Sequence, residues 1–258
     1  MPVNLVFSDN GDVAEVVLAD PQKLNALDRD GLAEVSAAYL EAEHAGVRAL
    51  ILRGEGRAFC AGRDISHVDV EHDDVRGYLD DLTDLMHRMA AFPAPTFAVA
   101  TGACLGVGIG LLIATDVVYV ADDAKIGSPF ANLGAILDSG GHSLFYERLG
   151  AHRTLDLMYT AELMTGAEAV ALGLFSRAVS SADILEFTRT RAARVAAGPT
   201  SAFLASRALV HQLRDERVGL WASLADESSA QIALADTADY REGFTSFGEK
   251  HKPKFTGR

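Results

Sequence analysis

Hydrophobic and polar positions along the first two-thirds of the chain follow two periods, that of strands and that of helices. Short apolar runs alternate with longer segments in which apolar residues recur every three or four positions, and Asn10-Gly11-Asp12 between the first two runs is a hairpin signal. Strands are predicted at 3–7, 13–18, 48–53, 95–100, 116–121 and 174–179, and helices at 28–44, 73–89, 165–172 and just after the glycine-rich 102–110 segment. This alternation predicts an α/β fold.

The last third of the chain has a different pattern. From Ser181 onward the sequence favours helices almost throughout, with Pro199 separating two of them. We therefore expect a core over residues 1–198 and a helical region over residues 199–258 that packs on the core or on a neighbouring subunit.

Charge and cysteine content narrow the function classes. The 258 residues include 36 acidic and 23 basic side chains, a formal charge of −13, so general binding to nucleic acid or to an anionic membrane surface is not expected. Cys60 and Cys104 are expected to be free thiols in a reducing compartment. No signal peptide is recognisable, and the longest apolar run, residues 107–114, is too short to span a bilayer. We expect a cytoplasmic protein.

Three candidate motifs do not lead to a site. The glycines at 106, 108 and 110 lack the spacing of a dinucleotide-binding loop, because position 111 is leucine. The segment from His67 to Asp74 contains metal-ligand residue types, but it is interpreted as a polar loop entering a helix, with Asp73 and Asp74 at its N-terminus; no metal site is predicted. Cys60 is interpreted as a small buried residue rather than a nucleophile.

Several ordered motifs carry a family resemblance. They are Asn25-Ala26-Leu27, GRAFCAGRDI at 56–65, GACLGVG at 102–108 and PFANLGAILDSGG at 129–141. Together they resemble the crotonase (enoyl-CoA hydratase/isomerase) superfamily, and the resemblance extends over nearly the whole chain. It implies a crotonase (ClpP-like) spiral of ββα units with a helical C-terminal region.

The resemblance implies an oxyanion hole that acts on acyl-CoA thioesters. Its two donors correspond to the backbone N–H groups of Arg63 and Val107. Val107 stands at the predicted start of an apolar helix, where an unpaired N–H and the helix dipole would stabilise an enolate. Glycines on either side of Val107 would let the backbone approach the thioester. Alternatively, these glycines serve only tight helix packing.

The sequence departs from ordinary hydratases at the acid and the base. The two glutamates of those enzymes correspond here to Gly110 and Phe130, and neither can transfer a proton. Asp138 instead matches the acid/base of a subgroup that contains the phenylacetate-pathway 1,2-epoxyphenylacetyl-CoA isomerase and relatives that move a 3-enoyl double bond to position 2. One carboxylate suffices for isomerisation, because a proton leaves one carbon and returns to another.

Two features of the surroundings of Asp138 bear on this role. Burial beside Phe130, Ile136 and Leu137 would make the carboxylate a stronger base. His142 would orient it if both residues lie on one helix face. The alternative to catalysis is an N-cap role for Asp138 at the following helix.

Further positions are implied to contact coenzyme A, which is part of the substrate and not a separate cofactor. Lys23 and Leu24 would run beside the pantetheine and pyrophosphate. Ala61, Asp64 and Ile65 would line the adenine pocket, mainly through their backbone.

The C-terminal tail is implied to complete the CoA site. Phe247 and Lys250 match positions that contact CoA, often from a neighbouring subunit, and a lysine there would meet the 3′-phosphate. Members of the family form homotrimers or dimers of trimers. The sequence thus predicts an acyl-CoA isomerase; the alternatives are a hydratase with a non-standard acid, supplied by the His67–Asp74 loop, and a non-catalytic acyl-CoA binder.

Overall fold

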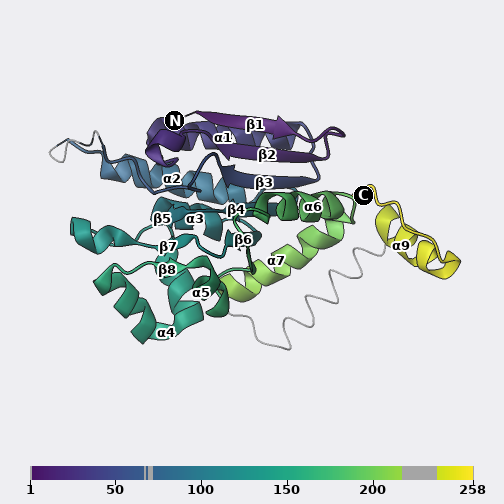
Figure 1. Cartoon of the computed structure of the whole chain (residues 1–258). Helices are drawn as coiled ribbons and strands as arrows, with labels where there is room; N and C mark the ends of the chain where they lie inside the picture. Colours follow the sequence, from purple (N-terminus) through teal and green to yellow (C-terminus); the bar gives the residue numbers. More distant parts are fainter. Residues whose placement is uncertain (1, 67, 69–71, 217–236, 258) are drawn as a thin grey trace.

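A computed structural model describes residues 2–66, 68, 72–216 and 237–257 (Figure 1). A large sheet runs through the molecule in the order β1-β2-β3-β4-β6-β9. Its first pair, β1 and β2, is an antiparallel hairpin, and every following pair is parallel. The strands are β1 (Val3–Phe7), β2 (Val13–Leu18), β3 (Ala49–Gly54), β4 (Thr96–Ala100), β6 (Val117–Ala121) and β9 (Arg177–Val179).

The centre of this sheet is buried on both faces. Every residue of β2 and of β4 is buried, as are the first four of β3. Parallel strands covered on both sides need such continuous apolar sequence, which explains why VAEVVL, ALILRG and TFAVA read as strands. Predictions for the six strands of this sheet are confirmed to within a few residues.

A second, three-stranded sheet was not expected from the sequence. It consists of β5 (Ala103–Leu105), β7 (Lys125–Gly127) and β8 (Met164–Thr165), with β5 parallel to β7 and β7 antiparallel to β8. Strands this short, within or beside glycines, carry too few residues for a recognisable period. They matter because β5 leads directly into the candidate site.

Side-chain caps begin three of the predicted helices where they were expected. Asp28 accepts a hydrogen bond from the Gly31 N–H, and Asp74 accepts one from the Gly77 N–H. Thr165 and Glu168 form a reciprocal capping box. The helices are α1 (Arg29–His44), α2 (Val75–Ala90), α3 (Val107–Ile113), α4 (Gly141–Thr160), α5 (Gly166–Ala171), α6 (Ile184–Ala196), α7 (Thr200–Glu216) and α9 (Ala238–Glu249), with 3₁₀ turns η1 (Pro21–Lys23) and η2 (Pro129–Leu133).

Two helices show what the sequence pattern leaves undetermined. A helix after Asp138 was considered, but the bounds of α4 were not predicted; Gly150, at φ 74° and ψ 171°, interrupts it, so no single apolar period runs along its length. Helix α9 lies beyond the end of the large sheet, well separated in Figure 1 from α2 and α3. The proposed boundary at residues 198 and 199 falls between α6 and α7 and stays a prediction.

Helices cover the large sheet, and the candidate site forms beyond the carboxyl ends of its strands β3 and β4. Helix α6 packs on β2, β3, β4 and β6, while α1 packs on β1, β2 and α2. Cys60 and Cys104 lie in the core, fully buried and unpaired by a disulfide, as expected. Within the described ranges, no helix is both long and apolar enough to cross a membrane.

Candidate active site

The loops that follow β3 and β4 run side by side and bring the two predicted oxyanion donors together. The N–H of Phe59 donates to the Thr101 carbonyl at 2.6 Å, and that of Cys60 donates to the Ala103 carbonyl at 3.0 Å. The Leu105 N–H returns a hydrogen bond to the Cys60 carbonyl at 3.0 Å. This short ladder places the segment after Cys60 against the start of α3.

Gly62 is the point of closest approach between these two segments. Its φ is +107°, and a Cβ atom built on it would lie 3.2 Å from the Leu105 carbonyl oxygen and 3.9 Å from the Val107 nitrogen. A residue with a side chain would therefore be strained and crowded here. Glycine is required at position 62 because the two segments that carry the Arg63 and Val107 amides meet there.

Both amides are oriented away from the ladders around them. The Leu27–Arg63 bridge uses the N–H groups of Leu27 and Asp64, so the Arg63 N–H faces the other side, as the geometry of a parallel bridge requires. Val107 is the first residue of α3, where helical N–H groups have no partner within the helix. The arrangement is suited to binding an oxygen that gains negative charge.

The Arg63 side chain fastens this loop to α2. Its guanidinium contacts Asp73 at 2.5 Å and lies 4.3 Å from the ring centre of Tyr78. The Tyr78 hydroxyl donates to the Leu27 carbonyl at 3.0 Å, which closes the connection back to the Leu27–Arg63 bridge. Burial raises the pKa of Tyr78.

Asp138 lies in the loop before α4. It is partly buried and accepts a hydrogen bond from the Ser139 hydroxyl at 2.5 Å. Ser139 in turn packs on Gly110, since a Cβ atom built there would lie 2.4 Å from the Ser139 Cβ. Gly110 is three residues after Val107 and so lies on the same face of α3.

Of the expectations around Asp138, some need correction. The N-cap of α4 is Gly140, and no side chain caps this helix, so Asp138 is not its N-cap. His142 lies within α4 and is exposed, whereas Asp138 precedes the helix, so the two do not share a helix face. Ile136 is 78% exposed and does not bury the carboxylate, whereas the Leu137 side chain is itself buried.

Phe130 borders the oxyanion donors. Its ring edge would lie 3.0 Å from a Cβ atom built on Gly106, the N-cap of α3, and Gly106 in turn approaches Gly62. Phe130 thus borders the start of α3, and Ser139, which donates to Asp138, packs further along the same helix. Ser139 is the residue that sequence reasoning missed. Its only signal, a positive φ at a non-glycine residue, is a property of the fold.

The predicted CoA contacts before residue 66 also come together. Lys23 Nζ contacts the Asp64 carboxylate at 2.6 Å, and this lysine holds the pKa of Asp64 well below its usual range. The Ala61 N–H donates to the Leu24 carbonyl at 3.0 Å, and Ile65, next to Asp64, is half exposed. Together they form one rim beside the Arg63 amide.

The tail residues are not part of this rim within one chain. Phe247 belongs to α9, and Lys250 follows it with an exposed side chain and a φ of 61°. Figure 1 shows α9 far from α2 and α3. A contact between Lys250 and this CoA rim would have to come from another copy of the chain.

Metal chemistry finds no support in the described part of the chain. Asp74 caps α2 and Asp73 pairs with Arg63, so the acids at the helix end already have structural roles, as the polar-loop interpretation expects. Residues 67 and 69–71 lie outside the described residues. Elsewhere in the described ranges, no group of three or more His, Cys, Asp or Glu side chains is arranged to hold a metal ion.

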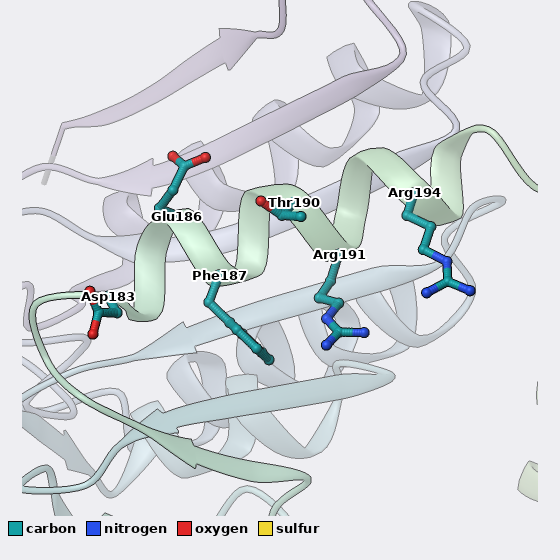
Figure 2. A pocket seen from close by; sticks show the side chains of 6 residues that line it. All are labelled: Asp183, Glu186, Phe187, Thr190, Arg191 and Arg194. Atoms are coloured by element: carbon teal, nitrogen blue, oxygen red, sulfur yellow. The ribbon is translucent and has the colours of Figure 1, made fainter.

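A separate hollow of about 540 Å³ lies along α6 (Figure 2). Arg191 lies over the ring of Phe187 there, 5.0 Å from its centre. None of the predicted site residues lines it; its walls are Asp183, Glu186, Phe187, Thr190, Arg191 and Arg194. This hollow and the cluster at α3 are distinct features.

Comparisons with known proteins give one consistent family. The model of a family described as enoyl-CoA hydratase/isomerase matches residues 8–258. A Rhodobacter capsulatus protein named "Probable enoyl-CoA hydratase" is 34% identical over 247 residues, 95% of each chain. A Zymoseptoria tritici protein named an enoyl-CoA isomerase/hydratase is 29% identical over 266 residues, covering 96% of this chain and 85% of its own.

Solved structures extend the similarity to the fold. An enoyl-CoA hydratase subunit from Geobacillus kaustophilus superposes with a TM-score of 0.89 at 31% identity, over 99% of this chain and 98% of its own. An enoyl-CoA hydratase from Bacillus anthracis gives 0.90 at 26% identity, over 99% of both chains. These matches confirm the crotonase fold expected from the sequence.

Proposed function

The chain belongs to the enoyl-CoA hydratase/isomerase family, and we propose that within it this protein is an acyl-CoA isomerase with Asp138 as its acid/base. One observation carries the proposal. Ser139, which donates a hydrogen bond to Asp138, packs on Gly110, three residues along α3 from the Val107 amide. One carboxylate is thereby tied to the helix that carries a proposed oxyanion donor. The positions that match the glutamates of ordinary hydratases hold Gly110 and Phe130, which transfer no proton.

The proposed mechanism begins with the thioester oxygen between the N–H groups of Arg63 and Val107. The Asp138 carboxylate removes a proton from C2 of a 3-enoyl-CoA, and the electron pair delocalises into a dienolate whose charge rests on that oxygen. The protonated Asp138 returns the proton to C4, and the double bond moves from C3–C4 to C2–C3. No water is consumed, and the carboxylate ends in its starting state.

The acyl group belongs to the proposal as well. A 3-enoyl-CoA and the ring epoxide 1,2-epoxyphenylacetyl-CoA are the two substrate types suggested by the motif resemblance. Both place a reactive carbon next to a thioester carbonyl, so the same two amides would bind either. The partly buried Phe130, beside Gly106, offers an aromatic wall to the acyl chain.

Hydration remains the second candidate because several relatives, including the one from Rhodobacter capsulatus, are named hydratases. It would need an acid other than the usual pair. Of the two acids in the His67–Asp74 loop that the structure describes, Asp73 is paired with Arg63 and Asp74 caps α2. These existing roles favour isomerisation.

We further propose that the active assembly is a homotrimer or a dimer of trimers. The distance of α9 from the CoA rim in Figure 1 supports this, because Lys250 would reach CoA only in a neighbouring subunit. Exposed apolar side chains on α4 and α7 offer the surface for such contacts; they are Tyr146, Leu155, Tyr159, Val210 and Leu213.

The substitution Asp138→Asn tests the proposal. It keeps the size of the side chain but removes its ability to exchange a proton, so kcat for a 3-enoyl-CoA should fall by a factor of about 10² to 10⁴. Affinity for the acyl-CoA, measured by calorimetry, should stay unchanged. Glu147→Gln on the exposed face of α4 is the control and should leave kcat unaltered.

Near-normal turnover by Asp138→Asn would refute the assignment. Tight acyl-CoA binding by the unmodified protein with no turnover of either proposed substrate would instead favour a non-catalytic binder.

A further inference from the structure

Ser139 has a backbone conformation that few residues with a side chain adopt. Its φ is +60°, in the left-handed region, directly before Gly140 at φ +79°. A serine in this conformation is strained, whereas a glycine adopts it readily. A glycine at position 139 would relieve that strain, yet the chain holds a hydroxyl-bearing residue there.

The strained backbone directs this hydroxyl to the Asp138 carboxylate. Ser139 Oγ donates to Asp138 Oδ1 at 2.5 Å, the short distance expected when a hydroxyl meets a carboxylate. Both side chains are partly buried. Among the described residues, we find no second hydrogen bond to this carboxylate, which leaves Oδ2 as the oxygen available to exchange a proton.

Gly110 holds Ser139 from the other side. A Cβ atom built on Gly110 would lie 2.4 Å from the Ser139 Cβ, 3.2 Å from its Oγ and 3.2 Å from its carbonyl oxygen. The serine therefore rests directly on the backbone of α3, on the face that begins with Val107. This contact fixes the position of the Asp138 carboxylate along α3, the helix that carries one proposed oxyanion donor.

We infer that Ser139 is a positioning residue for Asp138, holding Oδ1 so that the carboxylate keeps one orientation and presents Oδ2 to the substrate. This inference rests on the proposed function. Its physical basis is that a donor to one oxygen restricts rotation of the group about its χ2 torsion. Because the serine does not touch the reacting carbons, it acts through the aspartate alone.

The test compares Ser139→Gly and Ser139→Ala with the unmodified enzyme, using a 3-enoyl-CoA as the probe. Both variants lack the hydroxyl, and the glycine variant also relieves the strained φ, so at least that one is expected to fold fully. We expect kcat to fall about tenfold to a hundredfold in both variants with KM unchanged. An unchanged KM would assign the loss to the chemical step rather than to binding, as expected of a misaligned carboxylate.

Two controls separate positioning from general damage. Ser143→Ala removes an exposed hydroxyl in the first turn of α4 and should change neither kcat nor KM. Thermal unfolding of the Ser139→Gly protein should show no loss of stability, so that its lower kcat reports on the Asp138 carboxylate and not on unfolding.

The outcomes distinguish this inference from the proposed function. An unchanged kcat in both Ser139 variants would overturn the positioning role, even if Asp138→Asn is inactive. A rise in KM with an unchanged kcat would also overturn it, since that pattern marks a role in binding. Full activity of Asp138→Asn would overturn the proposed function itself, whatever the Ser139 variants show.

Discussion

Asn25 and Ser139 lie at two places in the site where a single polar residue determines the position of others. Asn25 is fully buried; its amide donates to the carbonyls of Glu55 and Ala58 at 3.0 and 2.8 Å and accepts from the Asp20 N–H at 2.9 Å. These bonds hold the turn that carries Lys23 and Leu24 against the loop after β3. The Asn-Ala-Leu motif identifies the residue from sequence, but its role is visible only once the turn is folded.

Gly62→Ala tests the oxyanion hole at the level of one residue. The new Cβ would be crowded by the Leu105 carbonyl and strained by a φ of +107°, so the neighbouring Arg63 amide should turn away from its position. Losing one such donor lowers kcat by a factor of about 10² to 10³.

Gly173→Ala is the matched control for this substitution. Gly173 also has a positive φ, +79°, but nothing lies within 4 Å of a Cβ atom built there. It should lose some stability and keep its kcat, as judged by thermal unfolding and steady-state kinetics. Equal kcat values for the two variants would argue against an oxyanion role for the Gly62–Arg63 segment.

At the scale of elements, a partly buried ion-pair cluster fastens α6 to the large sheet. Glu15 on β2 is 8% exposed and contacts Arg53 on β3 and Arg189 on α6, each at 2.6 Å. Burial alone would raise the pKa of Glu15, but the hydrogen bonds from Arg189 and Arg53 outweigh it and lower the pKa. The ionised glutamate thus stabilises the folded state above its unfolded pKa.

This stabilisation should disappear as pH falls through the lowered pKa of Glu15, where the folded protein must take up the proton. Glu15→Gln is therefore expected to be less stable by roughly 1–3 kcal/mol at neutral pH and to lose less stability on acidification. Urea unfolding at several acidic pH values would measure both effects. Glu41→Gln on the exposed side of α1 should track the unmodified protein; if Glu15→Gln did so too, the cluster would contribute nothing.

The sequence predicts elements well where burial imposes a period and poorly where partners are distant. Long apolar runs such as β3 and capped helices such as α1 and α5 were expected close to their observed bounds. By contrast, β5, β7 and β8 exist because distant segments pair, and each is too short to signal this locally. The same reason separates Asp138, identified by its motif, from Ser139, whose role depends on contact with Gly110 twenty-nine positions earlier.

For the whole molecule, the proposed assembly makes a prediction about Lys250. If this lysine meets the 3′-phosphate of CoA bound to a neighbouring subunit, Lys250→Ala should raise KM for an acyl-CoA roughly tenfold and leave KM for the matching dephospho-CoA ester unchanged. Lys254→Ala, four residues further along the exposed tail, is the control. Equal changes in KM for both esters, or none, would remove Lys250 from the CoA site.

We propose that this protein rearranges a thioester without adding water. To test this, the unmodified protein is incubated with a 3-enoyl-CoA in D₂O, and the mass of the product is measured by mass spectrometry. We expect a 2-enoyl isomer with no added water, whose only gain in mass comes from hydrogen exchanged for deuterium. A product heavier by one molecule of D₂O would contradict it and establish hydration instead.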